Sequence, residues 1–112
     1  MDRSGRKLVR KNKRLKARFG IDEPSRAAFT GNASTGGVHI VTNMPERPGT
    51  RLQLTIELPD GQEIRASGIV CWAKKVPASV MRLSKFAGMG VRFTRFDSGQ
   101  QVYEDFVKGL RF

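Results

Sequence analysis

The sequence TRLQLTIELPDGQEIRASGIVCWAKKV occupies residues 50–76 and decides the fold class. Its first part alternates apolar and polar side chains, and the apolar positions are Leu52, Leu54, Ile56 and Leu58. A period of two residues is typical of a β-strand with one buried and one solvated face. The Pro-Asp-Gly sequence at 59–61 then favours a tight turn. Residues 63–76 return as a second strand, in which Gly68 is predicted to form a bulge or bend. The segment is therefore predicted to be an antiparallel hairpin.

Shorter strand-like segments surround this hairpin. They cover residues 15–20, 26–30, 38–42 and 88–96. Residues 31–37, which read GNASTGG, are predicted to form a turn-rich loop between two of these strands. Six short strands, each with one solvated face, bury their edges best when the sheet closes on itself. The chain is therefore predicted to be mainly β, with a six-stranded antiparallel β-barrel.

A helix is predicted at the C-terminal end of the chain. Asp97 and Gln100 have the spacing of a capping box, which marks the start of a helix. Val102, Phe106 and Leu110 then recur every four residues. This pattern predicts an amphipathic α-helix of about three turns that packs on the barrel.

Positive charge is concentrated at the N-terminus. Residues 1–18 hold nine basic residues and one acid, a net charge of +8, whereas the other residues carry only +3 of the total of +11. We expect a basic arm over residues 1–14 and a single barrel-plus-helix domain over residues 15–112. Such an arm attracts phosphates. No apolar run has the length of a membrane span or the form of a signal peptide, so a soluble cytoplasmic protein without membrane insertion is expected.

The composition disfavours catalysis and metal binding. His39 is the only histidine and Cys71 the only cysteine, so the chain has no set of residues for a zinc site or a histidine relay. The acidic residues fall in turns and on polar strand faces, and their spacing brings no two carboxylates together on one substrate. We therefore expect a non-enzyme without metal or cofactor.

Two short motifs stand in a fixed order around the first predicted strands. Arg10 and Arg14 form an RxxxR pattern directly before residue 15, and residues 32–37 read Asn-Ala-Ser-Thr-Gly-Gly, a [D/N]xSxxG pattern. Together with the predicted barrel, the trailing helix and the sequence Gly-Met-Gly-Val-Arg-Phe at 88–93, they resemble the PilZ domain over residues 6–110. The resemblance implies a bacterial receptor for cyclic dimeric GMP (c-di-GMP).

The resemblance also implies a binding set, which consists of Arg10, Arg14, Asn32, Ser34 and Gly37. Arginine suits this ligand because its planar fork pairs with guanine edges or phosphates and stacks on bases. Secondary candidates are Arg6, Lys13, Gly36 and Trp72. The first position of the second motif is Asp or Asn in the family, and in this chain it is Asn32. A neutral amide accepts hydrogen bonds from guanine more weakly than a carboxylate does. The expected affinity is correspondingly lower.

The arginine pattern occurs in overlapping registers. Arg6 and Arg10, and likewise Arg14 and Arg18, have the same spacing, so Arg6 and Arg18 are possible substitutes. Arg10 and Arg14 are preferred because Arg14 directly precedes the first predicted strand, as in the family. The plainer interpretation of the arginines is a solvated run of charge, and that of residues 32–37 is ordinary turn chemistry. Neither explains why the two motifs occur together.

The expected function is that of a c-di-GMP-binding effector. The ligand would close the arm onto the barrel and change a surface for an unidentified protein partner, with motility, biofilm formation or exopolysaccharide synthesis as the regulated process. One alternative is a nucleic-acid-binding barrel with a basic tail, which the single Tyr103 and single Trp72 disfavour because they supply no row of stacking aromatics. The other is a PilZ-like interaction module that does not bind nucleotide.

Overall fold

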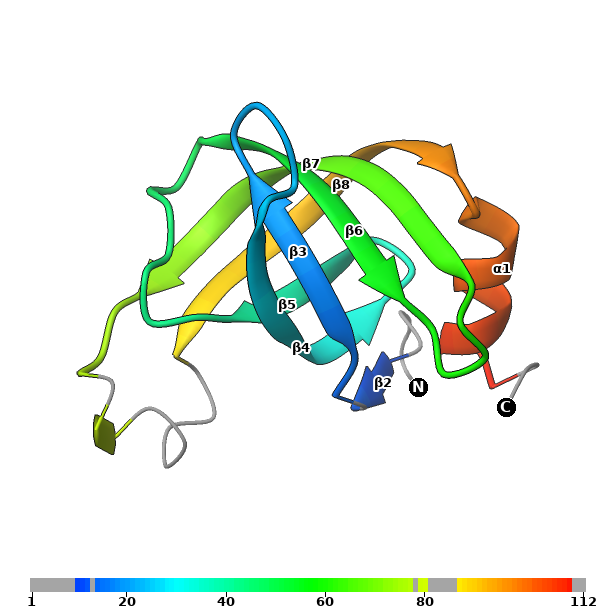
Figure 1. Ribbon diagram of the computed structural model, residues 1–112, viewed down its shortest axis with the longest axis horizontal. Helices are drawn as coiled ribbons and strands as arrows, with labels where there is room; N and C mark the ends of the chain where they lie inside the picture. The colour runs from blue at the N-terminus through cyan, green and yellow to red at the C-terminus, as the bar shows by residue number, and fades with distance from the viewer. Residues whose placement is uncertain (1–9, 13, 78, 81–86, 110–112) are drawn as a thin grey trace, which may run out of the picture.

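The computed structural model describes residues 10–12, 14–77, 79–80 and 87–109. The strands are β2 (Arg10–Asn12), β3 (Lys16–Gly20), β4 (Arg26–Ser34), β5 (Gly37–Val41), β6 (Arg51–Glu57), β7 (Glu63–Lys74) and β8 (Gly88–Ser98), and the helix α1 (Gln100–Val107) follows them. Figure 1 shows the strands wrapped around one core, with α1 at one end of the barrel.

The barrel is closed and antiparallel. Six strands follow one another in the order β4-β3-β6-β7-β8-β5, and β5 pairs back with β4. The predicted fold class is thereby confirmed: a six-stranded antiparallel barrel with one C-terminal helix. Strand β2 lies outside this closed ring and pairs with β4 alone among the described strands.

The hairpin of β6 and β7 has the predicted form. The two strands pair in continuous register from Arg51 opposite Ile69 to Glu57 opposite Glu63. The alternating leucine and isoleucine side chains of β6 point into the core. A register shift in the β7–β8 pairing occurs between Ser67 and Gly68, which confirms the predicted irregularity. The alternation therefore sets both the register and the buried face.

Strand β4 is longer than the sequence suggested. Its pairing with β5 shifts between Thr30 and Ala33, and the strand then continues to Ser34. The expected loop over residues 31–37 is therefore wrong in extent, because Asn32 and Ser34 belong to a strand and the connection shrinks to Thr35 and Gly36. The continuation is stabilised on its other edge, where β2 pairs with this part of β4.

The helix forms where predicted, but its start differs. The residue that precedes α1 is Gly99, which has a left-handed conformation with φ of 83°, and no side chain caps the helix. The predicted capping box of Asp97 and Gln100 is therefore wrong, because β8 continues through Asp97 to Ser98 and leaves the turn to glycine. The buried side chains of the helix are Tyr103, Phe106 and Val107, whereas Leu110 lies outside the described residues.

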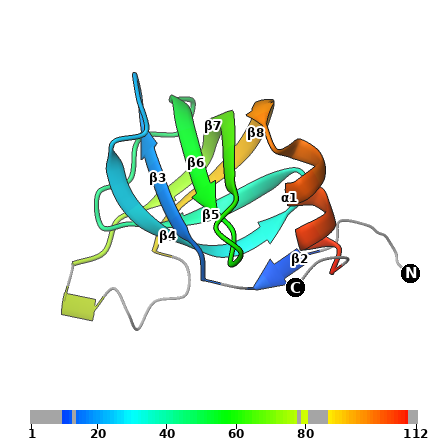
Figure 2. The same cartoon turned by 45° about the vertical axis from the view of Figure 1, so that its right-hand side comes forward.

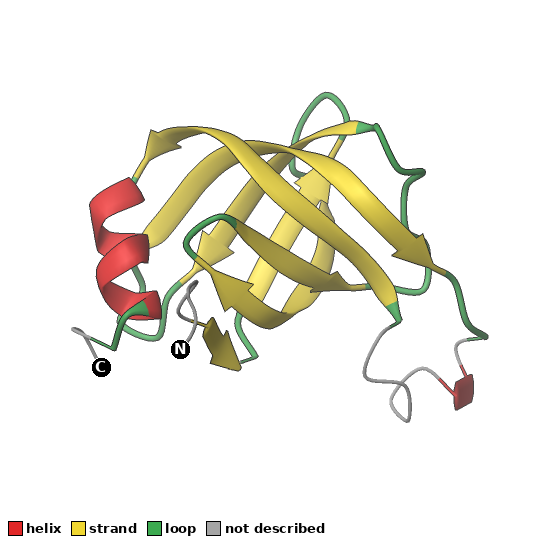
Figure 3. Cartoon of the chain, turned by 180° about the vertical axis from the view of Figure 1, so that it is seen from behind, coloured by secondary structure: helices red, strands yellow, loops and turns green. Residues whose placement is uncertain are grey.

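The views from other sides place α1 relative to the strands. Figure 2 shows the helix beside the turn that joins β4 to β5, and Figure 3 shows it across the end of the barrel. Strand β2 lies near the same end. Within the described residues, no helix is long and apolar enough to cross a membrane.

Candidate functional site

Two hollows lie on the surface of the barrel. The first, which we call the turn hollow, has a volume of about 620 Å³ and is lined by Asn32, Ser34, Gly37, His39, Trp72 and Arg92, among others. The second, the outer groove, has a volume of about 720 Å³, and its lining includes Arg14, Lys16, Arg18, Phe29, Thr55 and Glu63. Both volumes fall in the range of small-molecule sites. The lining residues decide which of the two hollows is the better candidate for a ligand site.

The turn hollow collects the residues of the second motif. Asn32, Ser34, Gly36 and Gly37 all line it, and so does Trp72 from β7. Its described lining contains one cation, Arg92, and no carboxylate. Arg92 lies opposite Gly37 in the pairing of β5 with β8. An anionic ligand therefore meets attraction here from a residue that the sequence did not single out.

The turn between β4 and β5 is held by several hydrogen bonds. The Ser34 hydroxyl lies 3.4 Å from the Gly37 carbonyl oxygen, a long and weak contact. The backbone N–H of Phe93 donates to the Gly36 carbonyl at 3.0 Å, which ties the turn to β8. From α1, the Tyr103 hydroxyl donates to the Ser34 carbonyl at 2.7 Å. Strand and helix thus both fix the shape of the turn.

The two glycines of the turn have different reasons to be glycine. A Cβ atom on Gly37 would lie 2.5 Å from the Val91 carbonyl oxygen, so this position must be glycine to let β8 approach. A Cβ atom on Gly36 would meet nothing within 4 Å. The close approach at Gly37 is therefore one of strand to strand.

One wall of the turn hollow is aromatic. The rings of His39 and Trp72 lie with their centroids 5.3 Å apart. The His39 Nε2 atom lies 2.7 Å from the Ala87 carbonyl oxygen; because a carbonyl only accepts, this nitrogen carries the hydrogen and the ring is fixed. Trp72 lies against Gly90, where any side chain would collide with the indole. Since Trp72 is 39% exposed, part of its indole remains free to stack on a ligand ring.

Strand β2 brings the first motif to the second. Its register places Arg10 opposite Ser34 and Asn12 opposite Asn32 on β4. Residues in such register lie about 5 Å apart across the strand pair, so the backbone of Arg10 lies beside Ser34, a residue of the turn hollow. The side chain of Arg10, together with Arg6 and Lys13, lies outside the described residues.

Arg14 points to the other hollow. Its guanidinium carbon lies 4.2 Å from the centroid of the Phe29 ring, and both residues line the outer groove. The backbone of the next residue, Leu15, is bonded to Thr30, through the Thr30 N–H and through the Thr30 hydroxyl, each at 2.9 Å. The backbone that follows Arg14 thus lies beside Thr30, two residues before Asn32 on β4, while the Arg14 side chain lies in the outer groove.

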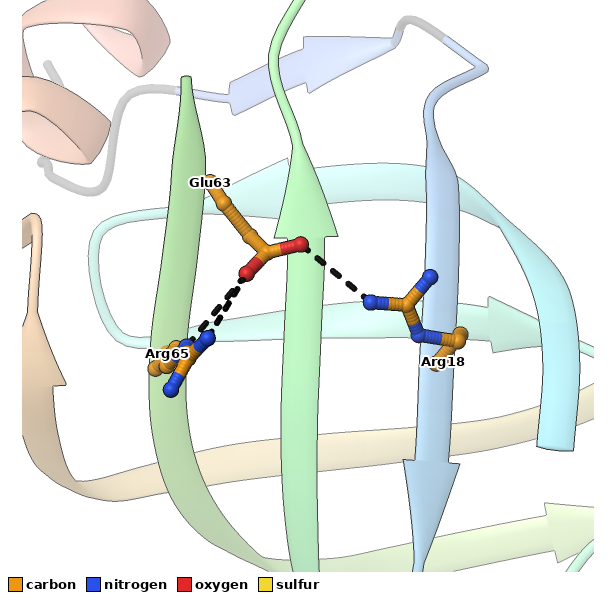
Figure 4. Close-up of polar contacts among 3 residues, drawn as sticks. All are labelled: Arg18, Glu63 and Arg65. Atoms are coloured by element: carbon orange, nitrogen blue, oxygen red, sulfur yellow. Dashed lines mark hydrogen bonds and ion pairs between the residues drawn. The ribbon is translucent and has the colours of Figure 1, made fainter. Parts of the chain in front are cut away.

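Arg18, the possible substitute, is engaged elsewhere. Figure 4 shows the Glu63 carboxylate reaching over β6 to Arg18 on β3 and contacting Arg65 on its own strand. The Arg18–Glu63 distance is 3.2 Å and the Arg65–Glu63 distance 3.3 Å. These side chains are largely exposed, so the pairs contribute little stability. Their effect is to hold Arg18 on the outer sheet face, within the outer groove.

Two contributors to the site carried no signal in the sequence. Arg92 and His39 reach the turn hollow only because β5 and β8 are neighbours. The ring of His39 is half-buried and hydrogen-bonded, as is typical of a packing residue. Among the residues that the structure describes, no three His, Cys, Asp or Glu side chains gather as a metal site would require.

Comparisons with known proteins bear on the family and the fold. The family model for the PilZ domain matches residues 4–109. No match was found among curated proteins. Among solved structures, the chain is similar to the Bacillus subtilis inhibitor of motility (MotI/DgrA), with a TM-score of 0.76 and 20% identity over 96% of this chain. The chain spans about half of that protein, 51% of its length, and at this identity the likeness shows the fold. Because the family match covers nearly the whole chain, the protein belongs to the PilZ domain family.

Proposed function

We propose that the protein is a c-di-GMP receptor that binds its ligand in the turn hollow. The observation that carries the proposal is the pairing of β2 with β4, which sets Arg10 opposite Ser34 and so joins the two motifs in one place. PilZ domains form a family of c-di-GMP receptors, and family membership supports the ligand class. The hollow supplies the chemistry that such a ligand needs.

Each part of the ligand has a matching group. The amide of Asn32 and the hydroxyl of Ser34 line the hollow and are suited to the hydrogen-bonding edge of a guanine. Trp72 offers an indole on which a base can stack. Arg92 lies across from Gly37 and is suited to a phosphate. Arg10 and Arg14 would then cover the ligand from the arm.

Binding requires Arg14 to change partners. In the free protein its guanidinium lies on Phe29 in the outer groove. A cation–π contact at an exposed site is worth only about 0.5–1 kcal/mol, less than a charge-assisted hydrogen bond to phosphate at about 1.5–3 kcal/mol. The ligand therefore outcompetes Phe29, and the outer groove loses the arginine that covers this ring. In this proposal the exposed groove is the surface that changes for a protein partner.

The regulated process is proposed from the structural neighbour. That protein is named as an inhibitor of motility. We accordingly propose that this chain acts through a protein partner in the control of motility, with biofilm or exopolysaccharide control as the other outcomes of the same mechanism.

Isothermal titration calorimetry tests the ligand directly. We expect saturable binding of c-di-GMP to the protein and no binding of GTP. The double variant Arg10→Ala/Arg14→Ala should lose binding by at least about a hundredfold, because two charge-assisted contacts disappear. The control variant Arg47→Ala/Arg51→Ala removes the same charge away from the hollow and should bind like the wild type. A folded wild-type protein that does not bind c-di-GMP would refute the proposal.

The same titration separates the nucleic-acid alternative. If the basic arm serves a nucleic acid, single-stranded oligonucleotides will bind with steep salt dependence and little base preference, and c-di-GMP will not compete. If the proposal is right, c-di-GMP will bind in moderate salt, and the oligonucleotides will be displaced or will not bind.

A further inference from the structure

Tyr103 connects the C-terminal helix to the turn of the candidate site. It lies in α1 and is fully buried, with 0% of its surface exposed. Its ring packs edge-on against Phe93 at 5.2 Å between centroids and near Phe96 at 5.7 Å, both of which belong to β8. These contacts fix the position of the ring, and so of its hydroxyl, relative to the barrel.

The hydroxyl bridges the two ends of the turn. It lies 2.7 Å from the Ser34 carbonyl oxygen and 3.3 Å from the Gly37 carbonyl oxygen. A phenol has a single proton, so the shorter contact is the main hydrogen bond and the longer one is secondary. Burial raises the pKa of Tyr103 well above its ordinary value, so the hydroxyl stays protonated and remains a donor at any physiological pH.

Ser34 is shared between the helix and the candidate site. The residue lines the turn hollow, and its hydroxyl faces the Gly37 carbonyl, while its own carbonyl accepts from Tyr103. Gly37 has the same double role, because it lines the hollow and its carbonyl receives the secondary contact. A movement of either peptide group therefore changes the hollow and the helix contact together.

The helix itself depends on its packing. It has eight residues, far fewer than an isolated helix needs to be stable in water. Its first turn holds no acid and its last turn no base that would favour the helix dipole. Its buried side chains are Tyr103, Phe106 and Val107. Loss of the Tyr103 contact consequently loosens both the turn and the helix.

We propose that Tyr103 is a positioning residue, whose hydroxyl holds the peptide groups of Ser34 and Gly37 in the arrangement that binds the ligand and so couples occupancy of the turn hollow to the docking of α1. The coupling to ligand rests on the proposed function. By reciprocity, a ligand that orders the turn stabilises the docked helix by the same factor. Binding of a ligand in the turn hollow then changes the stability of α1 at the end of the barrel.

The plainer interpretation is that a buried tyrosine merely satisfies its hydroxyl with the nearest carbonyls. The variant Tyr103→Phe keeps the ring and removes the hydroxyl. Val107→Ala is the matched control, because this residue is buried in the same helix, 2% exposed, and forms no part of the turn. Both variants should lower the melting temperature. Only the positioning role predicts that they differ at the turn.

The first measurement uses the free protein and no ligand. In amide hydrogen exchange of the full chain, Tyr103→Phe should speed exchange at Thr35 and Gly36 and shift their amide resonances, whereas Val107→Ala should leave both near wild type. Equal effects of the two variants on the turn, or no effect of Tyr103→Phe, would overturn the positioning role. This result does not depend on whether c-di-GMP binds.

The second measurement adds c-di-GMP to the wild type and both variants. Tyr103→Phe should weaken binding about tenfold, because the Ser34 carbonyl loses the Tyr103 donor and the ligand must supply the order that this hydrogen bond gave the turn. Val107→Ala should bind within about twofold of wild type. The ligand should slow amide exchange in α1 of the wild type, and much less in Tyr103→Phe. Equal affinities in all three proteins would overturn the coupling, and a wild type that does not bind would instead overturn the proposed function.

Discussion

Under the proposed function, the contact of Arg14 with Phe29 is the one that a bound ligand has to break. The guanidinium lies 4.2 Å from the ring centroid, and Phe29 is 39% exposed, so the contact lies at the surface of the protein. Removal of Phe29 frees Arg14 at small cost to the fold. The competition between Phe29 and the ligand for Arg14 can therefore be measured as a change in the affinity for c-di-GMP.

We expect Phe29→Ala to tighten c-di-GMP binding about two- to fivefold, which corresponds to a lost cation–π contact of about 0.5–1 kcal/mol in the free state. The gain should vanish in the Arg14→Ala background, as a double-mutant cycle by calorimetry would show. Unchanged affinity in Phe29→Ala would mean that Arg14 does not exchange Phe29 for the ligand.

The two glycines of the turn give a prediction on stability. Gly37→Ala should lower the free energy of unfolding by about 1–3 kcal/mol, because the new methyl group meets the Val91 carbonyl of the neighbouring strand. Gly36→Ala should change it by less than about 0.5 kcal/mol, since the space around this position is open. Urea unfolding of both variants measures the difference, and equal effects would contradict the packing seen at Gly37.

At the scale of elements, the start of α1 shows how strand and helix share a boundary. Strand β8 runs to Ser98, and Gly99 makes the turn with φ of 83°. A Cβ atom there would also lie 2.7 Å from the Ile64 side chain of β7. The boundary is set by backbone conformation and close packing, and no side chain caps the helix.

Gly99→Ala should therefore destabilise the protein by about 1–2 kcal/mol, through the strained φ and the crowded Ile64 side chain. Asp97→Ala should cost less than about 0.5 kcal/mol, because the ion pair that Asp97 forms with Arg95 at 3.0 Å is exposed. Thermal unfolding of the two variants shows whether Asp97 caps the helix. If it did, Asp97→Ala would lower the free energy of unfolding by about 1 kcal/mol.

At the scale of the whole molecule, the arm and the barrel are separable in the topology. The six strands of the ring close through β4 and β5, and β2 adds to β4 from outside that ring. The core is built from side chains of β3 to β8 and α1 together with Leu15 and Leu58. Of the arm, the structure describes the side chain of Arg14 alone, and Arg14 is not part of this core cluster.

Deletion of residues 1–13 should accordingly leave a folded barrel with a β-type circular dichroism spectrum and cooperative unfolding. The same deletion should abolish c-di-GMP binding, because the chain loses Arg10 and the strand that sets it opposite Ser34. A truncated chain that does not fold would show that the arm is part of the fold. A truncated chain that still binds c-di-GMP would show that the arm does not contribute to the site.

The sequence by itself determined the fold class. Alternation over residues 50–76 and in the shorter strands defines which face is buried, and this is a local property that any strand of period two displays. The order of the two motifs likewise pointed to the PilZ family, which the family match confirmed. The start of the helix at Gly99 and the length of β4 were missed, because both depend on pairing with strands distant in sequence.

Only the tertiary structure decided how the site is assembled. Arg92 and Trp72 come from β8 and β7, Tyr103 from α1, and each reaches the turn through the closure of the barrel rather than through any local pattern. The same holds for Arg14, whose sequence motif does not show that its free position is on Phe29. Local periodicity fixes which face of a strand is buried, whereas long-range pairing fixes which side chains meet.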